Sequence, residues 1–222
     1  PLQPRPRRNL RAPLLRPSVS SVPSVDLRRI YMFVYSPRYD EALKLAARAH
    51  RSQLRKGTDV PYIAHPVAVS VILIRHGFGE DLAIAGLLHD VVEDCGVPLA
   101  QIESAFGPAV ARLVAAVSET KAEAGVERPW EQRKAEQLER LRAAGPDVAA
   151  LKAADALHNA RSVLADLRES GPGVWSRFKR GAGPTLWYYR EVLGGVRAWL
   201  GDHPLARELA AAIDDLAAAA EP

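Results

Sequence analysis

One histidine and three carboxylates follow directly on an apolar run in this sequence. Residues 82–88 are all apolar or small, and His89, Asp90, Glu93 and Asp94 come next. A run of that kind is typical of a helix buried on nearly all sides. Ionisable groups at its end are costly unless they are paired or bind a metal ion. The pattern therefore favours a functional cluster over ordinary surface charge.

Helical spacing would place these side chains on neighbouring faces. His89 and Glu93 are four residues apart, as are Asp90 and Asp94, so each pair is expected to lie along one face of a single helix over 80–94. Adjacent His89 and Asp90 point about 100° apart and can lie on either side of one ion.

Two further residues could complete a metal site. His65 precedes Pro66 at the expected start of a helix, and Asp155 interrupts an Ala- and Leu-rich segment. Two imidazoles and two carboxylates suit one divalent ion such as Mn²⁺ or Fe²⁺, with water in the remaining positions. A His-Asp dipeptide alone occurs by chance, so the prediction depends on the whole set: His65, His89, Asp90 and Asp155.

The elements that must position these residues are predicted to be helices. Caps, prolines, glycines and apolar spacing divide the chain after Met32 into helical segments, separated by a loop at 55–64 and a polar linker at 122–130. We expect helices at about 36–53, 66–76, 80–94, 99–105, 108–121, 131–144, 147–169, 184–200 and 204–219, with a short piece at 175–179. The fold class predicted is all-α, a single helical bundle.

Bulk composition excludes several classes of protein. Hydrophobic residues at 48% and charged residues at 25% are ordinary for a globular domain. A single cysteine, Cys95, excludes an intrachain disulfide and a cysteine-rich zinc site. No apolar run approaches the roughly 20 residues of a membrane helix. We expect a cytoplasmic protein that does not bind membranes.

The net charge of +4 suggests nucleic acid as a partner, but the charge is unevenly distributed. Residues 1–31 hold seven arginines and one acid, whereas residues 32–222 hold 23 bases and 25 acids. The body is therefore slightly acidic, and we expect no nucleic-acid partner. The proline- and serine-rich segment 1–31 is predicted to be a disordered leader. It could be a targeting segment, a tail that touches polyanions, or an upstream extension from start-site choice.

Five segments of the body match one family in order. They are residues 46–56 (AARAHRSQLRK), 61–66 (PYIAHP), 87–94 (LLHDVVED), 106–107 (FG) and 151–161 (LKAADALHNAR). Over about residues 36–200 the chain resembles HD-domain phosphohydrolases of the RelA/SpoT hydrolase type, and among them the stand-alone small alarmone hydrolases. The resemblance implies one HD-type phosphohydrolase domain over 32–222.

The resemblance also implies roles for individual residues. His65, His89, Asp90 and Asp155 match the family's metal ligands, which usually hold Mn²⁺. Glu93 and Asp94 match its catalytic acidic pair. The residues that match its substrate-binding positions are Arg55, Lys56 and Asn159.

The implied reaction is hydrolysis of the 3′-diphosphate of (p)ppGpp to GDP or GTP and pyrophosphate, so the expected partner is a small purine nucleotide polyphosphate. An HD phosphohydrolase acting on (p)ppApp, NADPH or a nucleoside monophosphate is the alternative. A degenerate HD fold that only binds a nucleotide or a partner is a third possibility. Every metal-binding and acidic position is intact, which argues against it. The purine and the oligomeric state are left open.

Some positions depart from the family's pattern or stay ambiguous. Arg51 and Ser52 stand where a small residue and glycine are usual. His50 is expected to be a buried histidine, and His158 is not counted as a ligand. At least one aromatic in the segment 187–190 must be packing, because three consecutive side chains cannot face one way on a helix. Lys121 and Lys179 are expected to be solvated.

Overall fold

The computed structural model describes residues 35–123 and 125–220 of the chain. Within them, strands are confined to a hairpin of two residues each, β1 (Ala122–Glu123) and β2 (Val126–Glu127), paired antiparallel. The predicted all-α class is confirmed. The predicted leader at 1–31 lies outside the described residues, and its disorder stays a prediction.

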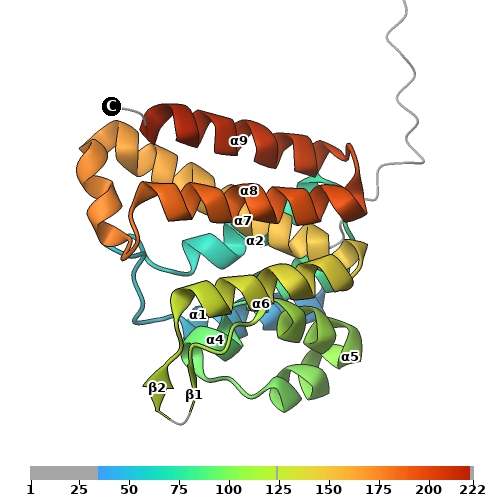
Figure 1. Cartoon of the computed structure of the whole chain (residues 1–222). Coiled ribbons are helices and arrows are strands. Elements are labelled where there is room, and N and C mark those ends of the chain that lie inside the picture. The colour runs from blue at the N-terminus through green and yellow to red at the C-terminus, as the bar shows by residue number, and fades with distance from the viewer. Residues whose placement is uncertain (1–34, 124, 221–222) are drawn as a thin grey trace, which may run out of the picture. The chain divides into compact units, whose positions relative to one another are not determined.

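Nine α-helices make up the described part of the chain (Figure 1). They are α1 (Pro37–Ala49), α2 (Ala64–Arg75), α3 (Glu80–Leu88), α4 (Val91–Cys95), α5 (Leu99–Val117), α6 (Trp130–Ala143), α7 (Pro146–Ser170), α8 (Ala182–Leu200) and α9 (Pro204–Ala220), with a 3₁₀ helix, η2 (Pro172–Arg177). None of the helices described is long and apolar enough to cross a membrane.

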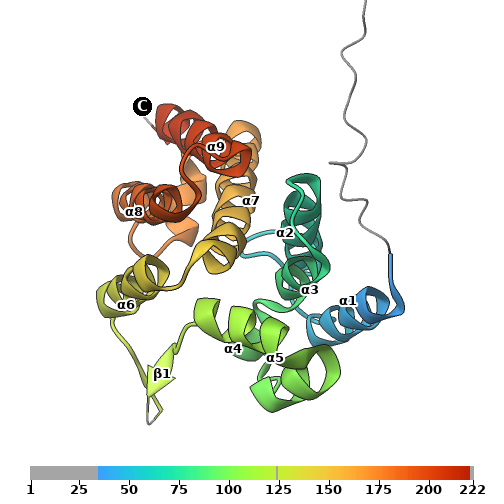
Figure 2. The same cartoon turned by 90° about the vertical axis from the view of Figure 1, so that its right-hand side faces the viewer.

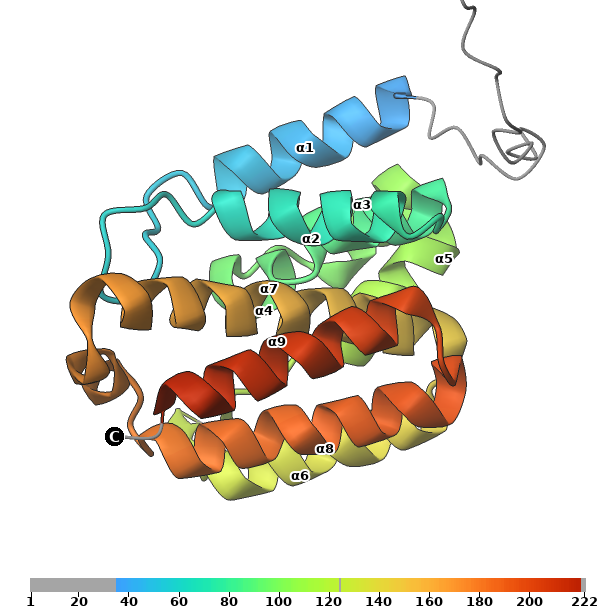
Figure 3. The ribbon, with the colours of Figure 1, turned by 90° about the horizontal axis from the view of Figure 1, so that it is seen from above.

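Helix α7 is the central element. It packs against α2 and α3 on one side and against α8 and α9 on the other. Figures 2 and 3 show it between a group formed by α1, α2 and α3 and a group formed by α6, α8 and α9. Many of its buried residues are alanines, which allow neighbouring helices to approach closely. A side chain on α7 can therefore meet side chains from both groups.

The prediction of one continuous helix over 80–94 is wrong, because the helix is interrupted. The chain forms α3, a two-residue turn at His89 and Asp90, and then α4. The His89 ring bonds the Gly86 carbonyl through Nδ1 at 2.9 Å, so a side chain engages a helix carbonyl at this point. The turn stays close to helical geometry, since the Asp94 amide still donates to the Asp90 carbonyl.

Other boundaries agree to within a few residues. Ser36 caps α1 by accepting from the Tyr39 amide, with Pro37 in the first turn, as expected. Helix α1 ends at Ala49 instead of near residue 53 because the following residues form a loop closed by a bridge between Leu54 and Pro61. The expected break near residue 107 is present as a kink at Gly107, where φ is +86°.

Helices α2 and α3 are in close contact at Gly86. A methyl group added there would lie 3.0 Å from the Ser70 Cα, closer than side-chain carbons normally come to a backbone. Glycine thus permits this separation. Helix α2 carries His65, and α3 ends directly before His89.

An ion cluster joins α2, α7 and α9. Glu208 of α9 bonds Arg75 and His76 at the end of α2, and Arg161 of α7 at 2.6 Å. Burial favours the neutral carboxyl, but these three partners outweigh it and lower the pKa of Glu208 to about 2. The cluster thus links α9 to α7 and to the end of α2, the helix that carries His65.

We predict that Glu208→Gln lowers the free energy of unfolding by about 1 kcal/mol at pH 7, since the cluster is partly exposed. A carboxyl group whose pKa is lower in the folded than in the unfolded protein stabilises the folded state at pH values above its unfolded-state pKa. That stabilisation is lost as pH falls towards the folded-state pKa. The difference from wild type in urea unfolding should therefore shrink as pH falls from about 5 to about 2. Exposed Glu103→Gln is the control, and a difference independent of pH would contradict the interpretation.

Candidate active site

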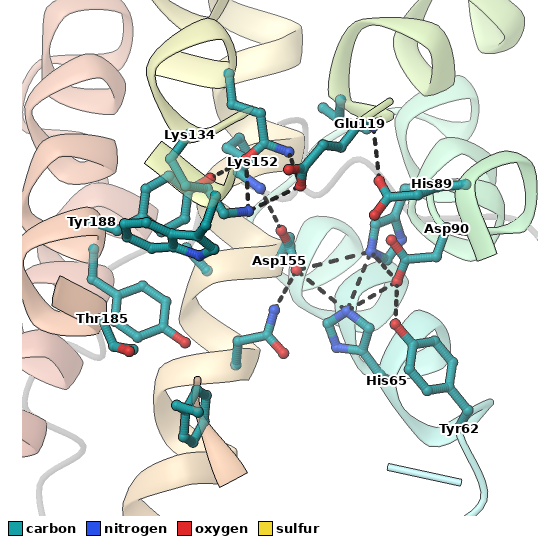
Figure 4. A pocket seen from close by; sticks show the side chains of 18 residues that line it. Tyr62, His65, His89, Asp90, Glu119, Lys134, Lys152, Asp155, Thr185 and Tyr188 are labelled. Carbon is teal, nitrogen blue, oxygen red and sulfur yellow. Dashed lines mark hydrogen bonds and ion pairs between the residues drawn. The ribbon is translucent and has the colours of Figure 1, made fainter. Parts of the chain in front are cut away.

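Four predicted ligands converge between α2, the turn after α3, and α7. His65 Nε2 lies 3.2 Å from His89 Nε2, 3.5 Å from Asp90 Oδ2 and 3.3 Å from Asp155 Oδ1. His89 Nε2 lies 3.0 Å from Asp90 Oδ2 and 3.9 Å from Asp155 Oδ1. Two imidazole nitrogens and two carboxylate oxygens thus surround one point, as Figure 4 shows.

The outward nitrogen of each histidine has its own partner. His89 Nδ1 lies 2.9 Å from the Gly86 carbonyl, which can only accept, so this nitrogen donates. His65 Nδ1 lies 2.8 Å from His158 Nδ1. In neutral His89 the proton on Nδ1 leaves the Nε2 lone pair for a metal ion, and His65 also turns its Nε2 towards the cluster. Outer partners of this kind orient metal-bound histidines.

The two carboxylates carry further partners. The Tyr62 hydroxyl donates to Asp90 Oδ2 at 2.8 Å. Lys152 donates to Asp155 Oδ2 at 2.9 Å, and the Asn159 amide donates to Asp155 Oδ1 at 2.6 Å. These bonds fix the orientation of both carboxylates.

The electrostatics of the cluster favour a bound cation. Burial alone would raise the pKa of Asp90 and of Asp155, but His89 and Lys152 respectively hold both well below their ordinary range. Burial lowers the pKa of His65. Burial would also lower that of His89, but Asp90 raises it to about 9. The cluster thus attracts positive charge, and a proton and a metal ion compete for the same atoms.

Glu93 and Asp94 of α4 lie beside the cluster and share one lysine. Lys121 lies 2.9 Å from Glu93 Oε1 and also pairs with Asp94. The Glu119 amide donates to Glu93 Oε2 at 2.8 Å. Burial raises the pKa of Glu93 even though Lys121 opposes the shift. Lys121 is half exposed, as expected for a solvated side chain, and it pairs with both carboxylates.

Two cavities lie beside the metal-ligand cluster; all four ligands border the first, and only His65 borders the second. One, about 290 Å³, is bordered by the cluster, Glu93, Lys134 and Lys152; we call it the lysine-lined cavity. The other, about 550 Å³, is bordered by Arg55, Lys56, Arg177 and His65; we call it the arginine-lined cavity. In Figure 4 the cluster faces Lys134, Lys152 and Tyr188 across the lysine-lined cavity.

The predicted substrate-binding residues lie on the arginine-lined side. Arg55 donates to Asn159 Oδ1 at 2.7 Å and its guanidinium lies 5.5 Å from the centre of the Tyr62 ring. Asn159 borders both cavities, and Lys56 borders the arginine-lined cavity. The structure thus connects Arg55 through Asn159 to Asp155. Asp94 borders neither cavity, unlike Glu93.

Of the aromatic segment at 187–190, Tyr188 and Tyr189 border the lysine-lined cavity. Trp187 is 45% exposed, and Arg190 is exposed and borders neither cavity. Of the other ambiguous residues, His50 is buried as expected, and Lys179 is exposed and pairs with Glu127.

Several residues at the site were not predicted. Tyr62, Glu119, Lys134 and Lys152 border the lysine-lined cavity, and His158 contacts His65. Lys152 offered one signal, since a lysine three residues before Asp155 in an apolar helix has few other partners. Glu119 and Lys134 look like surface charges in the sequence.

The donor set fits a divalent metal ion. His65, His89 and Asp155 offer ligand atoms that lie within 4.8 Å of one another, and Asp90 Oδ2 lies beside both histidines. Mixed nitrogen and oxygen donors suit the divalent ions of intermediate softness. Both histidines turn Nε2 towards the other ligand atoms.

The fold and this donor set define a metal-binding helical phosphohydrolase site, and comparison with known proteins agrees. A model of the HD domain matches residues 42–182. The chain belongs to the HD-domain family, and its site is that of a metal-binding hydrolase of this family.

Two relatives match more than half of this chain. The human guanosine-3′,5′-bis(diphosphate) 3′-pyrophosphohydrolase MESH1 is 38% identical over 142 residues, which is 63% of this chain and 74% of that protein. The GTP pyrophosphokinase of Streptomyces coelicolor is 39% identical over 128 residues, 56% of this chain and 14% of that protein.

Solved structures agree with the fold. A Listeria monocytogenes protein aligns with a TM-score of 0.62 at 38% identity, covering 68% of this chain and 96% of that one. A metazoan SpoT orthologue described as hydrolysing ppGpp aligns with a TM-score of 0.68 at 29% identity, covering 82% and 96%.

We predict that Asp90→Asn weakens Mn²⁺ binding by more than about tenfold, because changes to outer partners alone cost about 10–100-fold in metal-binding proteins. Isothermal titration of metal-stripped protein measures this. Asp214→Asn, an exposed change on α9, should bind as wild type does. Equal affinity in the Asp90 variant would remove that residue from the ligand set.

Proposed function

We propose that the protein hydrolyses the 3′-diphosphate of guanosine 3′,5′-bis(diphosphate) or its triphosphate form, and that the bound metal ion is Mn²⁺. The observation that carries the proposal is that the metal-ligand cluster borders the lysine-lined cavity and, through His65, also adjoins the arginine-lined cavity. A nucleotide with phosphates at both ends of its ribose would meet cations on either side of the reacting phosphorus. The names of the human relative and of the metazoan structure support the same substrate.

The arginine-lined cavity suits the nucleoside and its 5′-phosphates. It is the larger of the two. Its lining holds Arg55, Lys56 and Arg177 but one carboxylate, that of Asp166, which pairs with Arg177. A planar guanidinium beside the Tyr62 ring offers a surface on which a purine can stack. Lys56 forms no ion pair among the described residues and is available for phosphate.

The reaction needs a water directed at phosphorus and a group that takes its proton. A divalent ion, when bound, lowers the pKa of water and withdraws charge from the phosphoryl group. Glu93 borders the cavity, and burial raises its pKa, which makes its carboxylate a stronger base. We assign Glu93 as general base, and Asp94 as the residue that holds Lys121 against it.

The bond changes balance without a further reactant. The water oxygen bonds to the phosphorus attached to the ribose, and the bond from that phosphorus to the 3′-oxygen breaks. The proton taken by Glu93 is returned to the 3′-oxygen or to solvent. The products are pyrophosphate and a nucleotide with a free 3′-hydroxyl. We propose that this takes place in the cytoplasm, where a soluble nucleotide is the partner.

A panel of substrates tests the proposal. Purified protein with Mn²⁺ is assayed for phosphate and pyrophosphate release from ppGpp, pppGpp, ppApp, NADPH and deoxynucleoside monophosphates. Pyrophosphate release from the guanosine compounds with the highest kcat/KM is expected. Faster turnover of another member would reassign the substrate and keep the site chemistry.

We predict that Glu93→Gln lowers kcat by about 10²–10⁴-fold, the usual loss when a general base is removed. The four ligands are untouched, so the variant should still bind one Mn²⁺ per chain. Steady-state kinetics and metal titration on one preparation separate the two effects. Glu103→Gln on α5 serves as the exposed control, and wild-type kcat in Glu93→Gln would exclude this residue as the base.

A further inference from the structure

The lysine-lined cavity has a basic wall opposite the metal-ligand cluster. Lys134 of α6 and Lys152 of α7 both lie against the Tyr188 ring, at 4.8 Å and 5.8 Å from its centre. Figure 4 shows the two lysines and Tyr188 together on this side of the cavity, with Asp155 facing them.

The wall carries more positive than negative charge. The Glu119 carboxylate is almost fully buried and pairs with Arg133 at 2.7 Å and with Lys134 at 3.0 Å. One carboxylate thus serves two cations. Lys152 is balanced separately by Asp155. The group of Arg133, Lys134 and Glu119 therefore carries one net positive charge, which is costly away from water unless an anion meets it.

Lys134 is also held in place. Of the three donors on its ammonium group, one goes to Glu119 and one to Gln137 Oε1 at 3.2 Å. The Tyr188 hydroxyl bonds the same Gln137 oxygen. One donor of Lys134 remains beyond these partners, on a side chain that borders the cavity. A fixed cation with a spare donor is what a phosphate oxygen requires.

We infer that Lys134, supported by Lys152, binds the terminal phosphate of the 3′-diphosphate and then the pyrophosphate product. The inference rests on the proposed function, because it takes the phosphorus attached to the ribose to lie at the metal-ligand cluster. The nucleoside then occupies the larger arginine-lined cavity and the terminal phosphate extends the other way. Lys134 thereby selects a 3′-diphosphate over a 3′-monophosphate.

The test compares two substrates in one variant. Lys134→Met should lower kcat/KM for guanosine 5′-diphosphate 3′-diphosphate by about 10–100-fold, the value of a charge-assisted hydrogen bond. For guanosine 5′-diphosphate 3′-monophosphate the change should be less than about twofold. Lys179→Met is the matched control, since Lys179 pairs with Glu127 at the surface and borders neither cavity. Equal losses on both substrates would overturn the inference.

A product analogue separates this inference from the proposed function. Methylenediphosphonate with Mn²⁺ should bind Lys134→Met at least about tenfold more weakly than wild type by titration calorimetry. This binding measurement needs no turnover. If the wild-type protein hydrolyses neither guanosine compound, the proposed function is wrong, and the calorimetry still tests whether Lys134 binds the diphosphate. Unchanged affinity would overturn the inference.

A measurement on the wild-type protein covers the case in which Lys134→Met does not fold. With Mn²⁺ present, methylenediphosphonate should slow acetylation of Lys134 by acetic anhydride and leave Lys179 unaffected, as read by peptide mass spectrometry. Equal acetylation of Lys134 with and without the analogue would contradict its contact with phosphate.

Discussion

Two carboxylates that are nearly out of water lie on either side of two imidazoles, and the rest of the site depends on this arrangement. The Asp90 and Asp155 side chains are 17% and 14% exposed, and both have pKa values held low enough to stay charged. Buried like charges are stable only when cations meet them. Here His89 meets Asp90, Lys152 meets Asp155, and a divalent ion among the four ligand atoms would satisfy both.

The bundle supplies the backbone positions for this arrangement. The close contact of α2 and α3 at Gly86 brings His65 next to His89, and α7 passes both with Asp155. Through Asn159, Asp155 is also connected to Arg55 in the loop before α2. A nucleotide held by Arg55 would thus be positioned by the same helix that supplies a metal ligand.

Much of this could be predicted from the sequence because local signals carried it. Apolar spacing and caps indicated the helices, and the polar residues at 89–94 and 155 stood out against apolar neighbours. The break after α3 could not be predicted, since it accompanies a bond from the His89 ring to a backbone carbonyl. The basic wall was also missed. Glu119 and Lys134 are 15 residues apart on either side of a hairpin, and only the fold pairs them.

We propose that one divalent ion, held by His65, His89, Asp90 and Asp155, makes hydrolysis possible. Metal-stripped protein reloaded stepwise with Mn²⁺ tests it, with bound metal and pyrophosphate release from ppGpp measured on the same samples. Activity should rise in proportion to bound metal and reach its limit at one ion per chain. Full activity in the stripped protein, or a limit reached only at two ions per chain, would contradict the claim.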